Sequence, residues 1–248
     1  VEDVAVDRYL DPQLSRIRDT LQKKLPGAVV ELDNWSADRE HFVAFIERPG
    51  DAGGHYLYSA VTNHLQLLWL AYPDLNENHL GYRQGIEYKS RDGTAIPAYL
   101  TLPDDNMRTQ RPLVVLVHGG PAARDTLAFD WWASFLASRG YAVVQPNYRG
   151  SSGYGRAWQE AGYRQWGQLM QDDVEDAVHA LVRAGMADPE RVCIVGASYG
   201  GSAALSGGAR DPELYRCVAS IAGVSDLPLM LLTETIQHGR HSSTVDWW

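Results

Sequence analysis

The 248-residue chain is acidic, with 22 Lys and Arg against 31 Asp and Glu and a net charge of −9. This charge excludes a polyanionic partner such as nucleic acid, because phosphate binding requires clustered lysine and arginine. Hydrophobic residues make up 45% of the chain, which is enough for a substantial core. The length suits one large domain, or one domain and part of a second. No run approaches the about 18 consecutive apolar residues of a membrane span, so we expect no membrane partner.

The two cysteines, Cys193 and Cys217, both fall in segments that we predict to be core strands. We therefore expect two buried small apolar side chains rather than a disulfide or a metal-binding pair, and the redox compartment stays open. No signal-like segment opens the chain, which favours the cytoplasm. Val1 is not an initiator methionine, so the sequence also allows a signal peptide that has been removed.

The first third of the chain is rich in β-forming residues. Residues 41–47, 55–60 and 64–70 form three short runs separated by turns, and their spacing predicts hairpins of one antiparallel sheet or propeller blade. A polar, turn-rich segment at residues 73–81 follows and is predicted to be a linker. We therefore divide the chain into residues 1–80 and residues 81–248.

Beyond residue 81, predicted strands alternate with predicted helices. A hairpin comes first, at residues 86–90 and 95–102, and further strands are predicted at residues 113–117, 141–145, 192–195 and 217–224. Helices are predicted at residues 131–138 and 168–184, the second with one apolar face, and a third helix follows residue 198. Such alternation predicts βαβ units and a mostly parallel sheet that is covered on both faces.

The pentapeptide GASYG, residues 196–200, stands at the corner between a predicted strand and a predicted helix. In a nucleophile elbow the serine occupies a strained turn that exposes its hydroxyl, and glycines two positions away on each side prevent collisions. This pattern predicts that Ser198 is a nucleophile. The alternative is a glycine-rich helix start with a capping serine.

A second motif, HGGP at residues 118–121, follows the predicted strand at residues 113–117. In acyl transfer, backbone N–H groups stabilise the oxyanion of the tetrahedral intermediate. Tyr199, directly after the proposed nucleophile, is one expected donor, and the loop at residues 118–121 is expected to supply the other. Taken alone, the same four residues also fit an ordinary turn.

Five segments occur in one order: HGGP (118–121), NYRGSSGYG (147–155), WGQLMQDDVEDAV (166–178), DPERV (188–192) and GASYGG (196–201). Their order and spacing resemble the prolyl oligopeptidase family of serine peptidases, most of all its acylaminoacyl-peptidase and dipeptidyl-aminopeptidase branch. The resemblance covers residues 81–248, and the hairpins before residue 80 match the last part of the family's β-propeller. One departure is Ser202, where the family commonly has an aromatic residue, so we expect looser packing behind the nucleophile.

The resemblance implies an α/β-hydrolase fold preceded by the last strands of a β-propeller, which admits only short or unstructured peptides. It implies Ser198 as nucleophile and Tyr199 and Gly120 as oxyanion donors, with no cofactor and no metal. The alternatives are an esterase that shares the elbow and a non-catalytic binding protein that retains the motifs. The preferred substrate residues, the choice between aminopeptidase and endopeptidase action, and the oligomeric state stay open.

Other candidate residues receive structural roles. The acids Asp172, Asp173, Glu175 and Asp176 are expected to be solvated in the first turns of a helix rather than to bind a metal. Arg149 is expected to order its own loop through backbone carbonyls rather than to bind a substrate carboxylate. His118 lies at the end of the predicted strand 113–117, whereas the general base of this fold follows the last strand. We therefore expect a structural role for His118.

The acid and base of a triad should follow the nucleophile on loops after two later strands. Only one predicted strand, residues 217–224, follows Ser198; 248 − 224 leaves 24 residues, whereas each βαβ unit needs roughly 30. Asp226, His238 and His241 have the right order, but we do not expect them to form a triad. We therefore expect an incomplete hydrolase domain, a fragment whose exposed edge at residues 217–224 favours self-association.

Overall fold

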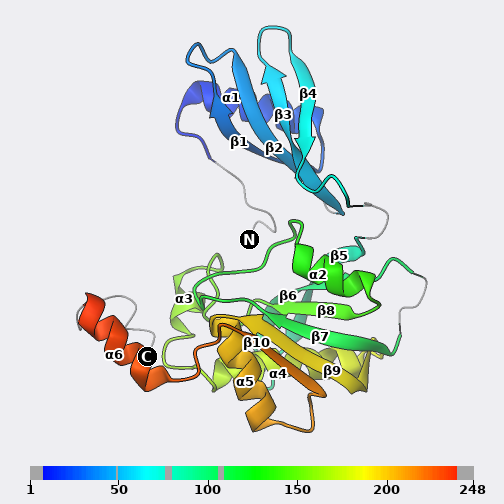
Figure 1. Cartoon of the computed structure of the whole chain (residues 1–248), viewed down its shortest axis with the longest axis vertical. Helices are drawn as coiled ribbons and strands as arrows, with labels where there is room; N and C mark the ends of the chain where they lie inside the picture. Colours follow the sequence, from blue (N-terminus) through cyan, green and yellow to red (C-terminus); the bar gives the residue numbers. More distant parts are fainter. Residues whose placement is uncertain (1–7, 49, 76–79, 106–108, 239–248) are drawn as a thin grey trace.

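The computed structural model describes residues 8–48, 50–75, 80–105 and 109–238. Figure 1 shows two β-sheets, one formed by β1 to β4 and the other by β5 to β10, joined by the segment that follows β4. Helices α2 to α5 accompany the second sheet, and α6 extends away from it. None of the helices in these described ranges is long and apolar enough to cross a bilayer.

The first sheet is antiparallel, with the strand order β1-β2-β3-β4. Its strands are β1 (Val29–Trp35), β2 (His41–Arg48), β3 (Asp51–Ser59) and β4 (His64–Leu70). The three strands predicted from the sequence are thereby confirmed. Helix α1 (Pro12–Lys24) and strand β1 were not predicted, although Asp11 caps the helix and Pro12 opens it, which is a recognisable start signal. The buried face of α1, with Leu14 and Leu21, packs against this sheet.

The second sheet has the strand order β10-β9-β7-β8-β6-β5. Its strands are β5 (Tyr82–Lys89), β6 (Ala95–Leu102), β7 (Arg111–Val117), β8 (Ala142–Pro146), β9 (Ala187–Ala197) and β10 (Cys217–Ile221). The predicted parallel arrangement is confirmed for β7, β8, β9 and β10, which are adjacent and parallel. Because β6 pairs antiparallel with both β8 and β5, the sheet as a whole is mixed.

Helices cover both faces of the second sheet. On one face, α4 (Leu169–Arg183) and α5 (Tyr199–Arg210) bury their apolar side chains against β7 and β9. On the other face, α2 (Trp131–Ser138) packs Ala133 against Val114 and Val143. The short helix α3 (Arg156–Glu160) contributes no buried side chain. The apolar stripe predicted for α4 is confirmed, since Met170 and Val174 are fully buried.

Strand β10 forms one edge of the second sheet, because β9 is the only strand that pairs with it among the described residues. Val218 and Ile221 on β10 are 39% and 52% exposed. Helix α6 (Leu227–His238) leaves Leu229 and Ile236 exposed as well. The edge is therefore apolar and open, as the sequence predicts, and self-association through it stays a prediction.

The two cysteines form a disulfide between β9 and β10, so the prediction of two free apolar side chains is wrong. Cys193 and Cys217 are direct partners in the parallel register, and their Cα atoms lie 4.7 Å apart, within the usual range for a disulfide. Cys217 is exposed rather than buried because it lies on the edge strand. The two cysteines are 24 residues apart in the sequence, and no sequence pattern indicated that the register of the two strands would pair them.

We expect both cysteines to resist alkylation in the unfolded, unreduced chain and to react after reduction. Mass spectrometry should then show two added alkyl groups only in the reduced sample. Closing a loop of 24 residues limits the unfolded chain, so reduction should lower the free energy of unfolding by about 3 kcal/mol. Alkylation of either cysteine before reduction would contradict the bond, and the Cys193→Ala/Cys217→Ala double variant is the control for effects of the reductant elsewhere.

Candidate active site

Ser198 lies between strand β9 and helix α5, at the position predicted for the elbow. Its backbone has φ 55° and ψ −122°, a combination that residues other than glycine rarely adopt, which confirms the predicted strain. The side chain is exposed and forms no capping hydrogen bond with the helix. The capping alternative is therefore contradicted, and the hydroxyl is open to an incoming molecule.

Glycines allow the backbone to approach closely around this turn. A Cβ atom on Gly200 would overlap the carbonyl oxygen of Val117 at the end of β7, and one on Gly196 would overlap the carbonyl oxygen of Gly200. A Cβ on Gly119 would lie 3.4 Å from the Cβ of Ser198. The loop that follows β7 therefore lies directly against Ser198, which is the arrangement that an oxyanion site next to a nucleophile requires.

The backbone N–H groups of Gly120 and Tyr199, the predicted donors, have no acceptor among the described residues. Tyr199 is the first residue of α5, where the N–H groups of a helix have no partner within the helix. Gly120 has a φ of 118°, and a Cβ there would lie 2.7 Å from the amide nitrogen of Ala122. Both groups are thus free to donate to a ligand, while their convergence on one point stays a prediction.

His118 is held by its neighbours through both ring nitrogens. Nδ1 lies 2.8 Å from the carbonyl oxygen of Gly119, and Nε2 lies 2.9 Å from the hydroxyl of Ser151. The ring stacks on Tyr148 with a centroid distance of 4.4 Å. Burial lowers the pKa of His118 to about 4, so the ring is neutral at pH 7. These contacts agree with the structural role expected for this histidine.

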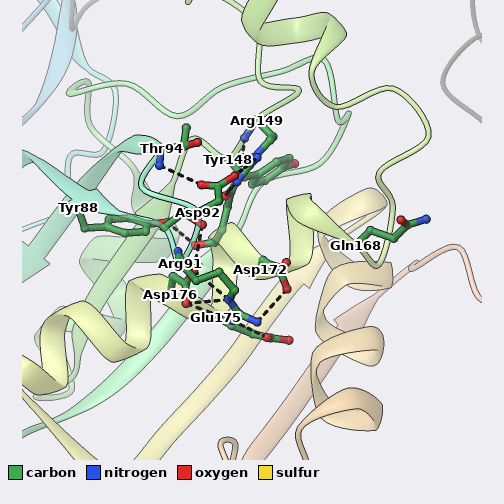
Figure 2. A network of polar contacts seen from close by, with 12 residues as sticks. Tyr88, Arg91, Asp92, Thr94, Tyr148, Arg149, Gln168, Asp172, Glu175 and Asp176 are labelled. Atoms are coloured by element: carbon green, nitrogen blue, oxygen red, sulfur yellow. Dashed lines mark hydrogen bonds and ion pairs between the residues drawn. The ribbon is translucent and has the colours of Figure 1, made fainter.

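The acids of α4 are paired, and most of them are buried, so the prediction of solvated acids is wrong. Asp173, Glu175 and Asp176 are only 0%, 3% and 6% exposed. Figure 2 shows part of the reason: Glu175 and Asp176 on α4 lie beside Arg91, which comes from another element. Arg91 in the β5–β6 turn lies 3.1 Å from both Glu175 and Asp176. In the ranges that the structure describes, no group of three or more His, Cys, Asp or Glu could hold a metal ion.

Arg149 also differs from its predicted role, because it binds carboxylates instead of backbone carbonyls. Its guanidinium donates to both carboxylate oxygens of Asp173, at 2.8 and 2.6 Å, and to Asp92 at 2.7 Å. The sequence could not reveal this pairing, since the partners lie 24 and 57 residues away. Arg149 does order its own loop, but through ion pairs with neighbouring elements.

Ser202 lies on α5 behind the elbow, where its hydroxyl donates to the carbonyl oxygen of Val224 at 2.7 Å. A cavity of about 300 Å³ adjoins it, lined in part by Trp166, Tyr199 and Leu227. A small side chain at this position thus coincides with open space next to helix α5. This agrees with the looser packing expected from the sequence.

The candidate triad partners do not meet Ser198 within the described residues. Asp226 is exposed and accepts the N–H of Leu229 at the start of α6. His238 is the last residue of α6, and its side chain, like the whole of His241, lies outside the described part of the chain. No described side chain forms a hydrogen bond with the Ser198 hydroxyl.

One residue that the sequence did not single out is Tyr148. It is fully buried, its hydroxyl donates to the carbonyl oxygen of His118 at 2.9 Å, and its ring lies 5.3 Å from that of Tyr199. It therefore contacts Tyr199, one proposed oxyanion donor, and His118, which lies two residues before Gly120, the other. The motif NYRGSSGYG contains Tyr148, but only the fold brings it to this position.

Comparisons with known proteins show the family of this chain. The model of the prolyl oligopeptidase family matches residues 127–247. Dipeptidyl aminopeptidase BIII of Pseudoxanthomonas mexicana is 35% identical over 246 residues, which cover 94% of this chain and 36% of that protein. The acylamino-acid-releasing enzyme of Rattus norvegicus is 31% identical, over 62% of this chain and 22% of that protein.

Solved structures of related peptidases show the same fold. A puromycin-hydrolyzing peptidase of Mycobacterium tuberculosis superimposes with a TM-score of 0.69 at 29% identity, over 82% of this chain and 32% of that one. This chain therefore spans about a third of the length of the dipeptidyl aminopeptidase and of the puromycin-hydrolyzing peptidase. The mixed sheet of this chain, with helices on both faces, matches the hydrolase domains of this family. Because the family model and these relatives match as well, the chain belongs to the prolyl oligopeptidase family of serine peptidases.

Proposed function

We propose that this chain carries the nucleophile and the oxyanion site of a serine peptidase that cleaves short peptides through an acyl-enzyme on Ser198. The observation that supports this most directly is the exposed Ser198 hydroxyl on strained backbone, beside the free N–H groups of Tyr199 and Gly120. We also propose that residues 1–80 belong to the last part of a β-propeller and residues 81–248 to an α/β-hydrolase domain. The four-stranded antiparallel sheet that precedes the mixed sheet supports this division.

In the proposed reaction, the Ser198 oxygen attacks the carbonyl carbon of the scissile bond while its proton passes to a base. The carbonyl oxygen becomes an oxyanion, to which Gly120 and Tyr199 donate their N–H groups, each contributing about 3 to 4 kcal/mol of transition-state stabilisation. The amine then leaves with the proton, and water hydrolyses the acyl ester. His118 is not the base in this scheme, because both of its ring nitrogens already have partners.

The proposal is tested with a fluorophosphonate probe followed by peptide mapping. We expect slow labelling at Ser198, none in Ser198→Ala, and labelling in Ser202→Ala, which removes a hydroxyl one turn along the same helix. Dipeptidyl and aminoacyl 4-nitroanilides and the matching 4-nitrophenyl esters separate the alternatives. Slow amide cleavage that Ser198→Ala abolishes supports a peptidase, and cleavage of the esters alone indicates an esterase. No labelling of Ser198 by the probe indicates a non-catalytic binding protein.

A further inference from the structure

Arg149 is bound to helix α4 through both its side chain and its backbone. Its Nε and Nη2 donate to the two carboxylate oxygens of Asp173, and its backbone N–H also donates to Asp173 at 3.0 Å. Its Nη1 donates to Asp92 in the turn between β5 and β6, as Figure 2 shows. A bidentate pair of this kind sets both the position and the orientation of the guanidinium.

This ion pair is buried. Asp173 is fully buried, and Arg149 is 6% exposed. The hydrogen bond from Arg149 also lowers the pKa of the Asp92 carboxyl well below its usual range. Losing one partner of a buried pair leaves the other charge without compensation, which is strongly unfavourable. The backbone at Arg149 is therefore held in one place relative to α4.

Tyr148, the preceding residue, connects this anchor to the loop of residues 118–121, here called the oxyanion loop. Its hydroxyl donates to the carbonyl oxygen of His118, and its ring stacks on the His118 imidazole at an interplanar angle of 17°. Ser151 adds a second connection, because its hydroxyl lies 2.9 Å from His118 Nε2 and donates to the carbonyl oxygen of Tyr148. Residues 148–151 thus hold both the backbone and the side chain of His118.

The oxyanion loop needs such support from outside. Gly119 and Gly120 have no Cβ, so their own side chains do not restrict their backbone, and glycine is the most permissive residue. The carbonyl of His118 belongs to the peptide plane that leads into Gly119. The N–H of Gly120 shares the following peptide plane with the carbonyl of Gly119, and that carbonyl oxygen lies 2.8 Å from His118 Nδ1. Fixing the backbone and the ring of His118 therefore limits the directions in which the Gly120 N–H can point.

We propose that Arg149, held by Asp173, is a positioning residue that acts through Tyr148 to fix the oxyanion loop beside Ser198. This inference rests on the proposed function, because only that function makes residues 118–121 an oxyanion loop. The inference itself concerns how rigidly the loop is held, which hydrogen exchange measures without catalysis. Failure of the one is therefore distinguishable from failure of the other. The competing explanation is that the ion pair only stabilises the fold.

The test is hydrogen exchange of the segment at residues 118–125, read by mass spectrometry. The N–H groups of Ala123 and Asp125 report on the loop, since Pro121 and Asn147 accept them at 2.8 Å each. Arg149→Lys keeps the charge but loses the bidentate contact, and Tyr148→Phe keeps the ion pair but loses the hydroxyl. We expect both variants to exchange this segment roughly three- to tenfold faster, while peptides from β7 and α4 stay unchanged.

The titration of His118 provides a second signature. Loosening of Tyr148 should admit water to the imidazole and raise the pKa of His118 from about 4 toward its ordinary value, which NMR of the ring protons can follow. Arg91→Gln is the matched control, because Arg91 also binds carboxylates on α4 but forms no hydrogen bond or ion pair with residues 148–151. Unchanged exchange at residues 118–125 in both Arg149→Lys and Tyr148→Phe, whatever their melting temperatures, would overturn the proposal.

Discussion

The 248-residue chain is expected to hydrolyse dipeptidyl and aminoacyl amides about 10⁴ to 10⁶ times more slowly than the longer dipeptidyl aminopeptidase that it resembles. A serine hydroxyl without a base is a weak nucleophile at neutral pH, and no described side chain forms a hydrogen bond with Ser198. Only substrate binding and the oxyanion donors would then accelerate the reaction. The measurement is the turnover number with a dipeptidyl 4-nitroanilide.

Ser198→Ala is the control, because it shows how much of the residual hydrolysis rate depends on the Ser198 hydroxyl. If the chain turns over substrate as fast as the dipeptidyl aminopeptidase, and His238→Ala or His241→Ala abolishes this activity, then a histidine of this chain is the base after all. Because self-association through the open edge at β10 would change the measured turnover, the oligomeric state should be determined on the same sample by light scattering.

Gly200→Ala is expected to lower the free energy of unfolding by about 3 kcal/mol or more. The added Cβ would overlap the carbonyl oxygen of Val117 and would lie 3.0 Å from that of His118. Both obstacles are backbone atoms of β7 and its following loop, so relief requires that strand and helix move apart. The higher helix propensity of alanine returns only about 1 kcal/mol. The melting temperature should therefore fall by roughly 6 to 12 °C.

Gly85→Ala is the matched control for this substitution. Gly85 lies on strand β5, and the nearest atom to an added Cβ is Cε1 of Tyr99 at 3.8 Å, an ordinary contact distance. We expect its melting temperature to stay within about 3 °C of that of the unchanged chain. Equal melting temperatures for the two variants would show that the close approach at Gly200 carries no energetic cost.

The sequence by itself determined the features that depend on neighbours along the chain. The alternation of apolar residues predicted β2 to β4, the stripe of α4 predicted its buried face, and GASYG predicted the strained backbone of Ser198. These are local properties, because residue spacing fixes which side of a helix or strand each side chain occupies, and glycines permit a turn wherever they stand.

Only the tertiary structure decided which distant residues meet. The parallel register of β9 and β10 places Cys193 opposite Cys217. Packing of α4 places Asp173 beside Arg149 from the loop after β8, and Glu175 and Asp176 beside Arg91 from the β5–β6 turn. Tyr148 gained its position in the same way. Burial of a charge depends on whether a partner is present, and a partner 24 or more residues away leaves no periodic signal in the sequence. The anchoring of the oxyanion loop is therefore a property of the fold alone.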